Sequence, residues 1–324
     1  MTVPMGPNGG GRATVALLAF SVLIWGTSWW PIDVASDHTS PIMLATLRIG
    51  PTLILVALIF AAFRRKLPEG RVLMASAVSG VLMFGFFQYV LMETVATLGP
   101  GNSAVVINTS PLFVGLLGFL FLHERLGVIG SAGLVIGFLG VVLMVWSQVG
   151  DFPSTGTLVG GVLLAFVGAL AWGIAALVLR SATRGRDDID MIGVTVVQYG
   201  AGAIVLVPVG FAVAGTSGTD WSAAGLWIPL LWIGPITALA LLFFFIVLQR
   251  MQAARATSVL FLIPAVAIVI EIVRGNAPGT VTLGGMFVAI LGVALVTAPR
   301  ELFTWAALRA GLSRARAWRA PGPA

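Results

Sequence analysis

The sequence contains no cysteine and only two histidines, and charged residues make up just 9% of its 324 positions. Without cysteine the chain forms no disulfide and offers neither a thiolate metal site nor a cysteine nucleophile. Two histidines, His38 and His123, are too few for a histidine-rich metal centre. Soluble domains carry roughly 25% charged residues. A chain of this length with so little charge cannot cover a water-facing surface, and the water-soluble class is excluded.

Long apolar runs are abundant instead. A membrane-spanning helix needs about 20 mostly apolar residues, and ten runs reach or approach that length. They cover residues 13–32, 39–63, 72–92, 94–122, 126–150, 152–179, 191–219, 221–249, 256–270 and 275–299. The first run is too long for the apolar part of a signal peptide, so we interpret it as the first span. The predicted fold class is an all-α polytopic membrane protein with ten transmembrane helices.

The positions of Lys and Arg indicate the orientation of these helices. With the N-terminus in the cytoplasm, sixteen of the 18 basic residues fall in cytoplasmic segments and the outer loops hold only Arg274. Cytoplasmic loops carry such an excess of Lys and Arg. We therefore predict a multi-pass protein of the inner (plasma) membrane with both termini in the cytoplasm. Since loop charge explains the net charge of +6, the expected partners are the lipid bilayer and a small-molecule substrate, not nucleic acid.

The two halves of the sequence contain matching residues in the same order, which indicates an internal repeat. The matching residues are Trp25-Gly26 with Trp172-Gly173, Arg48-Ile49-Gly50 with Gln198-Tyr199-Gly200, and Pro111 with Pro264, at offsets of 147, 150 and 153. With five helices in each half, the second half runs through the membrane upside down relative to the first. Two inverted five-helix repeats are typical of transporters, and the substrate site then lies near the membrane midplane between them.

Short motifs recur in the same order in both halves. They are IWGTSW in the first span, TSPLF at 109–113, HERLG at 123–127 and IGFLGVVLM at 136–144, then AWG, RMQAARATSVLFLIPAVA at 250–267 and AILGVALV at 289–296. Over about residues 13 to 298 the chain resembles the drug/metabolite transporter superfamily, specifically proteins with two EamA-type domains. The resemblance implies a fold and the export of small metabolites, but no binding site. Glu124 matches an acid that the family shows after the fourth helix of each half, whereas Asn276 or Ala277 stands there in the second copy.

The apolar runs and the resemblance together predict the domain organisation. A cytoplasmic tail, 1–12, precedes the first EamA-type repeat, 13–147. An outer linker, 148–157, leads to the second repeat, 158–298, and a basic cytoplasmic tail, 299–324, follows.

Arg48 is the most informative single residue, because it lies about eight residues inside an apolar run. Intramembrane charge is costly and usually faces a cavity or a partner. Arg48 is predicted either to attract a substrate carboxylate or to form an ion pair with Asp33 or Glu93, near the outer ends of their spans. Glu271 and Arg274, three residues apart on one helix face, are interpreted as a local ion pair or as a gate.

Other candidates are polar or aromatic residues inside apolar runs. The candidates for substrate binding besides Arg48 are Trp25, Gln88, Tyr89, Asn108, Trp172 and Gln198. Each could contact substrate, or could instead hold helices together by hydrogen bonding or packing. Pro111 and Pro264 are predicted helix breaks and hinges, since each removes a helical hydrogen bond. The small-residue pairs Gly133/Gly137 and Gly156/Gly160 predict close helix packing.

The function predicted from these features is a secondary transporter, an exporter of small organic metabolites such as amino acids or related compounds. Deep positions offer Trp, Gln, Asn and one Arg but no acid, which favours neutral, zwitterionic or carboxylate-bearing substrates over quaternary amines. One alternative is a membrane-embedded enzyme that acts on a diphosphate or lipid through the acidic stretch 187–190, although capping of the following helix explains those acids equally well. A passive metabolite channel is the other. No catalytic residue, metal or cofactor is expected.

Overall fold

The protein is helical throughout the part of the chain that its computed structural model describes. The described residues are 9–110, 113, 116–117, 120–121, 127–147, 154–183, 186, 188–248, 263–275 and 278–297. The α-helices are α1 (Gly9–Thr27), α2 (Trp29–Ser36), α3 (Pro41–Ala62), α4 (Gly70–Gly80), α5 (Phe87–Leu98), α6 (Pro100–Ile107), α8 (Gly127–Ser147), α9 (Thr155–Thr183), α10 (Met191–Ala214), α11 (Ala224–Leu231), α12 (Thr237–Leu248), α14 (Ile263–Val273) and α15 (Thr280–Thr297). Two π-helical segments, η1 (Val81–Phe86) and η2 (Trp232–Ile236), interrupt the third and eighth of the expected spans.

Six helical segments are long and apolar enough to cross a membrane. They are Ala16–Ser36, Pro41–Ala62, Gly70–Leu98, Thr155–Thr183, Met191–Ala214 and Ala224–Leu241. Two shorter apolar helices, Val128–Met144 and Thr280–Gly292, fall in the fifth and tenth expected runs. The fourth and ninth runs are described only in part, by α6 and α14. The predicted all-α, multi-spanning character is thus confirmed. The linker residues 148–153, the tails 1–8 and 298–324, and Glu124 lie outside the described residues.

One expected helix boundary was wrong. The third apolar run stops before the charged Glu93, which predicts a helix end there, but α5 continues through Glu93 to Leu98. The helix ends instead at Gly99, whose φ of 76° is a conformation that glycine adopts readily. Pro100 then begins α6, where its missing N–H removes no helical hydrogen bond. Backbone geometry, not a single charge, sets this boundary.

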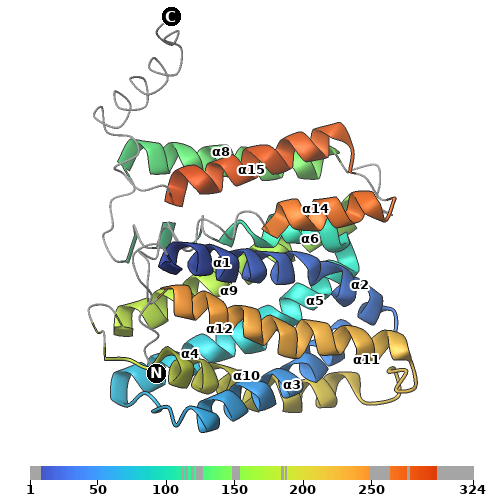
Figure 1. The fold of residues 1–324 in the computed structure, drawn as a ribbon. Helices are drawn as coiled ribbons and strands as arrows, with labels where there is room; N and C mark the ends of the chain where they lie inside the picture. Colours follow the sequence, from blue (N-terminus) through green and yellow to red (C-terminus); the bar gives the residue numbers. More distant parts are fainter. Residues whose placement is uncertain are drawn as a thin grey trace, which may run out of the picture.

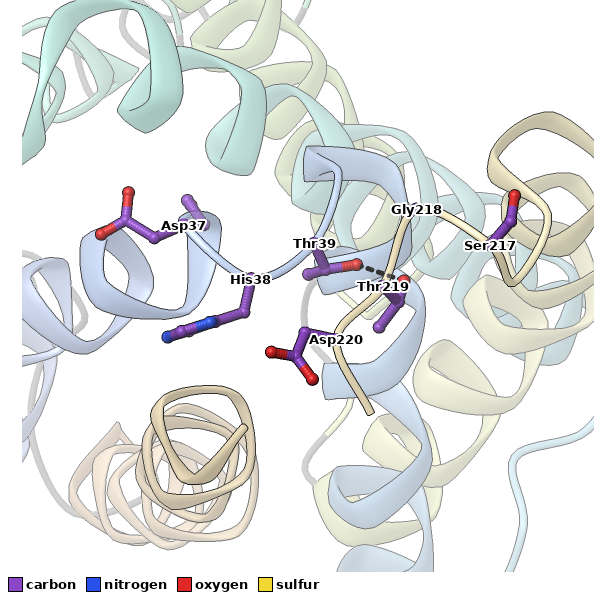
Figure 2. Close-up of a pocket in the computed structure, with 8 residues that line it drawn as sticks. Asp37, His38, Thr39, Ser217, Gly218, Thr219 and Asp220 are labelled. Carbon is purple, nitrogen blue, oxygen red and sulfur yellow. Dashed lines mark hydrogen bonds between the residues drawn. The ribbon is translucent and has the colours of Figure 1, made fainter. Parts of the chain in front are cut away.

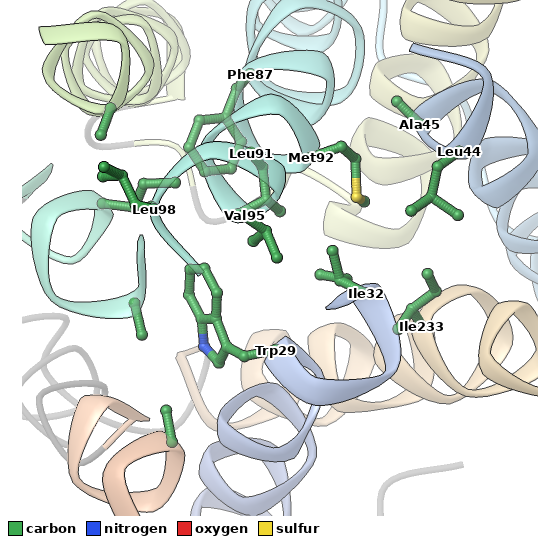
Figure 3. Close-up of a cluster of buried hydrophobic side chains, with 14 of the residues drawn as sticks. Trp29, Ile32, Leu44, Ala45, Phe87, Leu91, Met92, Val95, Leu98 and Ile233 are labelled. Atoms are coloured by element: carbon green, nitrogen blue, oxygen red, sulfur yellow. The ribbon is translucent and has the colours of Figure 1, made fainter. Parts of the chain in front are cut away.

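Helices from the two halves of the chain pack against each other. The largest contacts join α8 to α15, α3 to α10, α5 to α9 and α1 to α12. In Figure 1, α8 and α15 lie together along one edge of the bundle, and α3 and α10 lie toward the opposite edge. A buried cluster that includes Trp29 and Ile32 of α2, Phe87 and Met92 of α5, and Ile233 of η2 joins both halves near the centre (Figure 3).

Close approach of backbones explains several glycines in these interfaces. A Cβ atom added at Gly292 would collide with the backbone of Gly137, and one at Gly140 would collide with the backbone of Ala289. Gly137 therefore packs closely, as its spacing with Gly133 predicts. The same prediction for Gly156 and Gly160 was wrong, because an added Cβ meets only Ser154 Oγ at 3.6 Å from the first and nothing within 4 Å of the second. Small-residue spacing alone does not identify which helix face has a neighbour.

Two substitutions on α15 test this interface. We expect Gly292→Ala to destabilise the protein by about 1–3 kcal/mol, because overpacking forces two backbones apart. Gly284→Ala is the matched control on the same helix, since nothing lies within 4 Å of its added Cβ. The control should be neutral or stabilising by up to about 1 kcal/mol, because alanine favours helix. Thermal unfolding in detergent measures both variants, and equal unfolding midpoints would contradict the described α8–α15 contact.

Candidate functional site

Helix α3 carries Arg48 into the interior of the bundle. Pro41 occupies the first turn of α3, and Arg48 is seven residues further along, a rise of about 10 Å. The guanidinium group points toward α5 and the η2–α12 segment. Nε donates to the Ile233 carbonyl oxygen at 2.6 Å, Nη1 to Gln88 Oε1 at 2.9 Å, and Nη2 to Thr237 Oγ1 at 3.4 Å. The side chain is only partly buried, so some of its surface remains accessible.

The partners of Arg48 lie at the two π-helical segments. Gln88 follows η1 by two residues, Ile233 lies within η2, and Thr237 follows η2 directly. Pro235, which has no N–H, interrupts the hydrogen bonding of η2. The Ile233 carbonyl accepts from the Arg48 and Thr237 side chains. A break in regular helix thus exposes a backbone acceptor to the one charged side chain in this part of the bundle.

The two π-helical segments occupy matching places in the two halves. Their first residues, 81 and 232, are 151 positions apart, within the offsets of 147 to 153 that relate the sequence matches. Segments of this kind appear mostly at functional sites, and paired interruptions at corresponding repeat positions indicate the binding site of a transporter. The third and eighth expected spans are thus each interrupted by a π-helical segment. This pair of interruptions adds to the two prolines that the sequence predicts as breaks in the fourth and ninth spans.

Gln198, which matches Arg48 in the second half, bonds at the opposite end of η1. Its Nε2 donates to Ser79 Oγ at 2.8 Å. Its Oε1 is buried and has no partner among the described residues. The adjacent Tyr199 stacks on Phe84 of η1 with ring centroids 3.9 Å apart. Side chains from α3 and α10 therefore hold both ends of the same π-helical segment.

No acid compensates the charge of Arg48 within the described residues. Its three hydrogen-bond acceptors are a backbone carbonyl, an amide and a hydroxyl, all of them neutral. Asp33 pairs with Arg274 instead, and Glu93 forms no ion pair with any described residue. Neither of the two acids considered as ion-pair partners therefore neutralises Arg48 in this structure.

Three of the other predicted charged residues, Asp33, Glu271 and Arg274, form a cluster. Arg274 Nη1 lies 3.1 Å from Asp33 Oδ2 and 2.9 Å from Glu271 Oε1. Arg274 follows α14, Glu271 lies on α14, and Asp33 lies on α2, so the cluster links a helix of each half. Each pair that is accessible to solvent contributes roughly 0.2–1 kcal/mol. The Asp33–Arg274 pair, which joins α2 to α14, is partly exposed and can break and re-form as helices move, whereas Glu271 is buried.

The remaining predicted residues lie around the same core. Trp172 makes an edge-to-face contact with Phe87, with ring centroids 5.0 Å apart. Trp25 and Tyr89 are partly buried against the central apolar cluster. The Asn108 amide donates to the Ala104 carbonyl at the end of α6, at 2.6 Å, so that N–H group serves its own helix. Pro111 lies outside the described residues. Pro264 falls within α14, but its side chain is not among those described.

Within the acidic stretch 187–190, Asp190 caps the N-terminus of α10. Asp190 accepts a hydrogen bond from the Ile192 N–H at 3.0 Å and lies 3.7 Å from Arg65. Asp188 is exposed and pairs with Arg186 at 2.9 Å, which holds the pKa of the carboxyl below its usual range. Asp187 lies outside the described residues. The capping interpretation thus holds for Asp190.

A polar depression of about 550 Å³ lies between the α2–α3 and α10–α11 loops (Figure 2). His38 and Asp220 face into it, and a hydrogen bond of 2.7 Å between Thr39 and Thr219 closes one side. Hydrogen bonds from Ser222 hold the pKa of Asp220 below its usual range. Within the described ranges, no group of three or more His, Asp or Glu side chains could hold a metal ion. The depression joins loops of the two halves and is separate from the Arg48 site in the fold.

The site also contains residues that sequence reasoning missed. Ser79, Thr237 and the Ile233 carbonyl hold Gln198 or Arg48, and none was a candidate. The only sequence signal was Gly234-Pro235 inside an apolar run, which marks an interruption of the helix. η1, with the sequence VLMFGF, contains no proline and gave no comparable signal.

A model of the EamA-like transporter family matches residues 12–146 and again residues 159–298. The chain belongs to this family. As an EamA-like transporter it is 27% identical over 288 residues to the uncharacterized transporter YvbV of Bacillus subtilis, covering 87% of this chain and 91% of that protein. It is 26% identical over 296 residues to the uncharacterized inner membrane transporter YedA of Escherichia coli K12, covering 87% and 89%.

Two further comparisons cover almost the whole transporter. An uncharacterized transporter of Archaeoglobus fulgidus is 29% identical over 298 residues, covering 89% of this chain and 98% of its own. A crystal structure of a protein with 18% sequence identity aligns over 91% of this chain and 99% of that one, with a TM-score of 0.64. At that identity the structural likeness shows the fold alone. The resemblance to EamA-type transporters is confirmed, and the names of these relatives give no substrate.

Replacing Pro235 tests whether the η2 interruption matters for transport. In Pro235→Ala the restored N–H allows regular helix, which withdraws the Ile233 carbonyl from Arg48, so we expect about a tenfold or larger fall in transport. Thermal stability should be retained or raised, because a proline inside a helix costs about 3 kcal/mol. Pro208→Ala on α10 is the control, since Pro208 is also inside a helix but is exposed. Equal transport rates in the two variants would remove η2 from the mechanism.

Proposed function

We propose that this EamA-like transporter is a secondary carrier that exports small organic metabolites, such as amino acids or related compounds, across the plasma membrane. The observation that carries the proposal is that Arg48 bonds to Ile233 within η2 and to Gln88, which lies two residues beyond the matching segment η1. Interrupted helices from both halves that converge on one polar group are what a substrate site between two repeats requires. We place the proposed substrate site at Arg48 and the residues that hold it.

The proposed architecture is ten transmembrane helices in two inverted five-helix repeats, with both termini cytoplasmic. The helix contacts support it, because they occur in pairs that a two-fold relation would exchange. α1 packs on α12 as α9 packs on α5, and the matching helices α3 and α10, and α8 and α15, pack on each other. These pairs join the first to the eighth span, the sixth to the third, the second to the seventh and the fifth to the tenth.

In the proposed cycle, the Asp33–Arg274–Glu271 cluster closes the outer side between α2 and α14. The Asp33–Arg274 pair of 3.1 Å joins the two halves, and α2, which carries Asp33, begins after a break at Ser28. α2 also contains Pro31, and proline removes the hydrogen bond that would stiffen this junction. Swinging of α2 would separate Asp33 from Arg274 and open the site to the outside.

Counterflow in proteoliposomes tests the carrier function. Vesicles loaded with an unlabelled mixture of the proteinogenic amino acids should take up the radiolabelled mixture faster than empty vesicles, because a carrier returns loaded faster than empty. A passive channel gives no such acceleration. Protein-free vesicles give the background. Uptake that is independent of the internal load would contradict the proposal.

Single cysteines test the topology on a chain that naturally contains none. Ser217→Cys lies in the exposed loop after α10, and Ser181→Cys is the matched control at the exposed opposite end of α9. A membrane-impermeant maleimide added to intact cells should label Cys at position 217 and should label Cys at position 181 only after the membrane is permeabilised. Labelling of position 181 alone in intact cells would contradict the proposed orientation.

A further inference from the structure

The charge of Arg48 lacks a counter-charge in the described structure, although its guanidinium lies between three helices. All three acceptors are neutral, and the acids considered as partners are engaged elsewhere or form no ion pair within the described ranges. An uncompensated charge inside a membrane protein costs several kcal/mol. The site is therefore more favourable when an anionic group enters it.

The hydrogen bonds of Arg48 leave room for such a group. A guanidinium has five N–H bonds, and three are engaged by the described residues. The Nε bond of 2.6 Å fixes the plane of the group, whereas the Nη2 bond of 3.4 Å exceeds the usual 2.7–3.2 Å range and is weak. The Nη1 and Nη2 atoms together form an edge that binds a carboxylate in a bidentate manner once the carboxylate replaces their neutral acceptors.

Two side-chain donors, on a residue that holds Arg48 and on the neighbour of another, have no acceptor among the described residues. The Gln88 amide nitrogen has no hydrogen-bond partner in the described part of the chain, while its oxygen is occupied by Arg48. Trp232, adjacent to Ile233, carries a buried indole N–H that lacks any described partner. Donors without acceptors match an anionic group and repel a cationic one.

We infer that Arg48 binds the carboxylate of the transported substrate, which displaces the Gln88 oxygen from Nη1 and the Thr237 hydroxyl from Nη2. This inference rests on the proposed carrier function for its substrate, and it narrows the substrate class to carboxylates, including zwitterions. Ile233 holds the guanidinium in place throughout through Nε. Gln88 is the resident neutral ligand that satisfies Arg48 when no substrate is bound.

Matched acids and amides test the inference on the purified full chain. The probes are the proteinogenic amino acids and the two- to six-carbon monocarboxylates, each beside its primary amide. Binding is read from the shift in thermal unfolding, and transport from counterflow. We expect at least one acid to bind ten times more tightly than its amide. Arg48→Gln should abolish that preference: the affinity for the acid should fall at least tenfold and the affinity for the amide should not change. Arg48→Lys should retain part of the preference.

Gln88→Met separates ligand binding from a purely structural bond. Loss of the resident acceptor should lower the unfolding temperature without ligand and strengthen acid binding severalfold, whereas a structural role predicts weaker binding. The inference is overturned if no acid binds better than its amide, or if Arg48→Gln weakens the binding of acid and amide equally. It is also overturned if Gln88→Met weakens the binding of both compounds. Arg48-dependent acid binding without counterflow would overturn the carrier function alone. Counterflow of amides that is indifferent to Arg48 would overturn the inference alone.

Discussion

A guanidinium group inside an apolar helix bundle must be given hydrogen-bond acceptors, and the structure around Arg48 follows from that constraint. Regular helices satisfy their own backbone groups and offer few acceptors to neighbours. Here the acceptors come from a carbonyl in a π-helical segment and from polar side chains that follow such segments. The same interruptions bring the two halves of the chain to one point. The proposed substrate site therefore coincides with the interruptions of the α-helices.

Close helix packing gives this arrangement its rigidity. Glycines allow α10 to approach η1 and α3 closely: a Cβ at Gly202 would lie 2.8 Å from Phe84, and one at Gly210 would collide with Thr46. Since α3 packs on α10 and α8 packs on α15, the two halves interlock and cannot move apart as separate blocks. We expect conformational change to be carried by the interrupted helices α1–α2 and α11–η2–α12, which move against this interlocked frame.

Composition and apolar runs predicted the class of the fold, since a membrane imposes hydrophobicity on every span. Sequence reasoning also placed Arg48 inside a span and Glu271 beside Arg274, because each depends on position along one helix. The sequence did not allow us to predict which residues far apart in the chain form ion pairs. Nothing in the sequence around Asp33 indicated that Arg274, rather than Arg48, would be its partner. The η1 segment was missed because VLMFGF has the composition of an ordinary span, and η2 was marked only by Gly234-Pro235.

A structure of the transporter in a lipid nanodisc with a bound carboxylate substrate tests the central claim most directly. The account predicts both carboxylate oxygens within about 3.2 Å of the Arg48 Nη atoms. It further predicts that the Ile233 carbonyl still accepts from Nε and that the Gln88 oxygen has moved away. A substrate bound elsewhere, with Arg48 keeping its bonds to Ile233, Gln88 and Thr237, would contradict it.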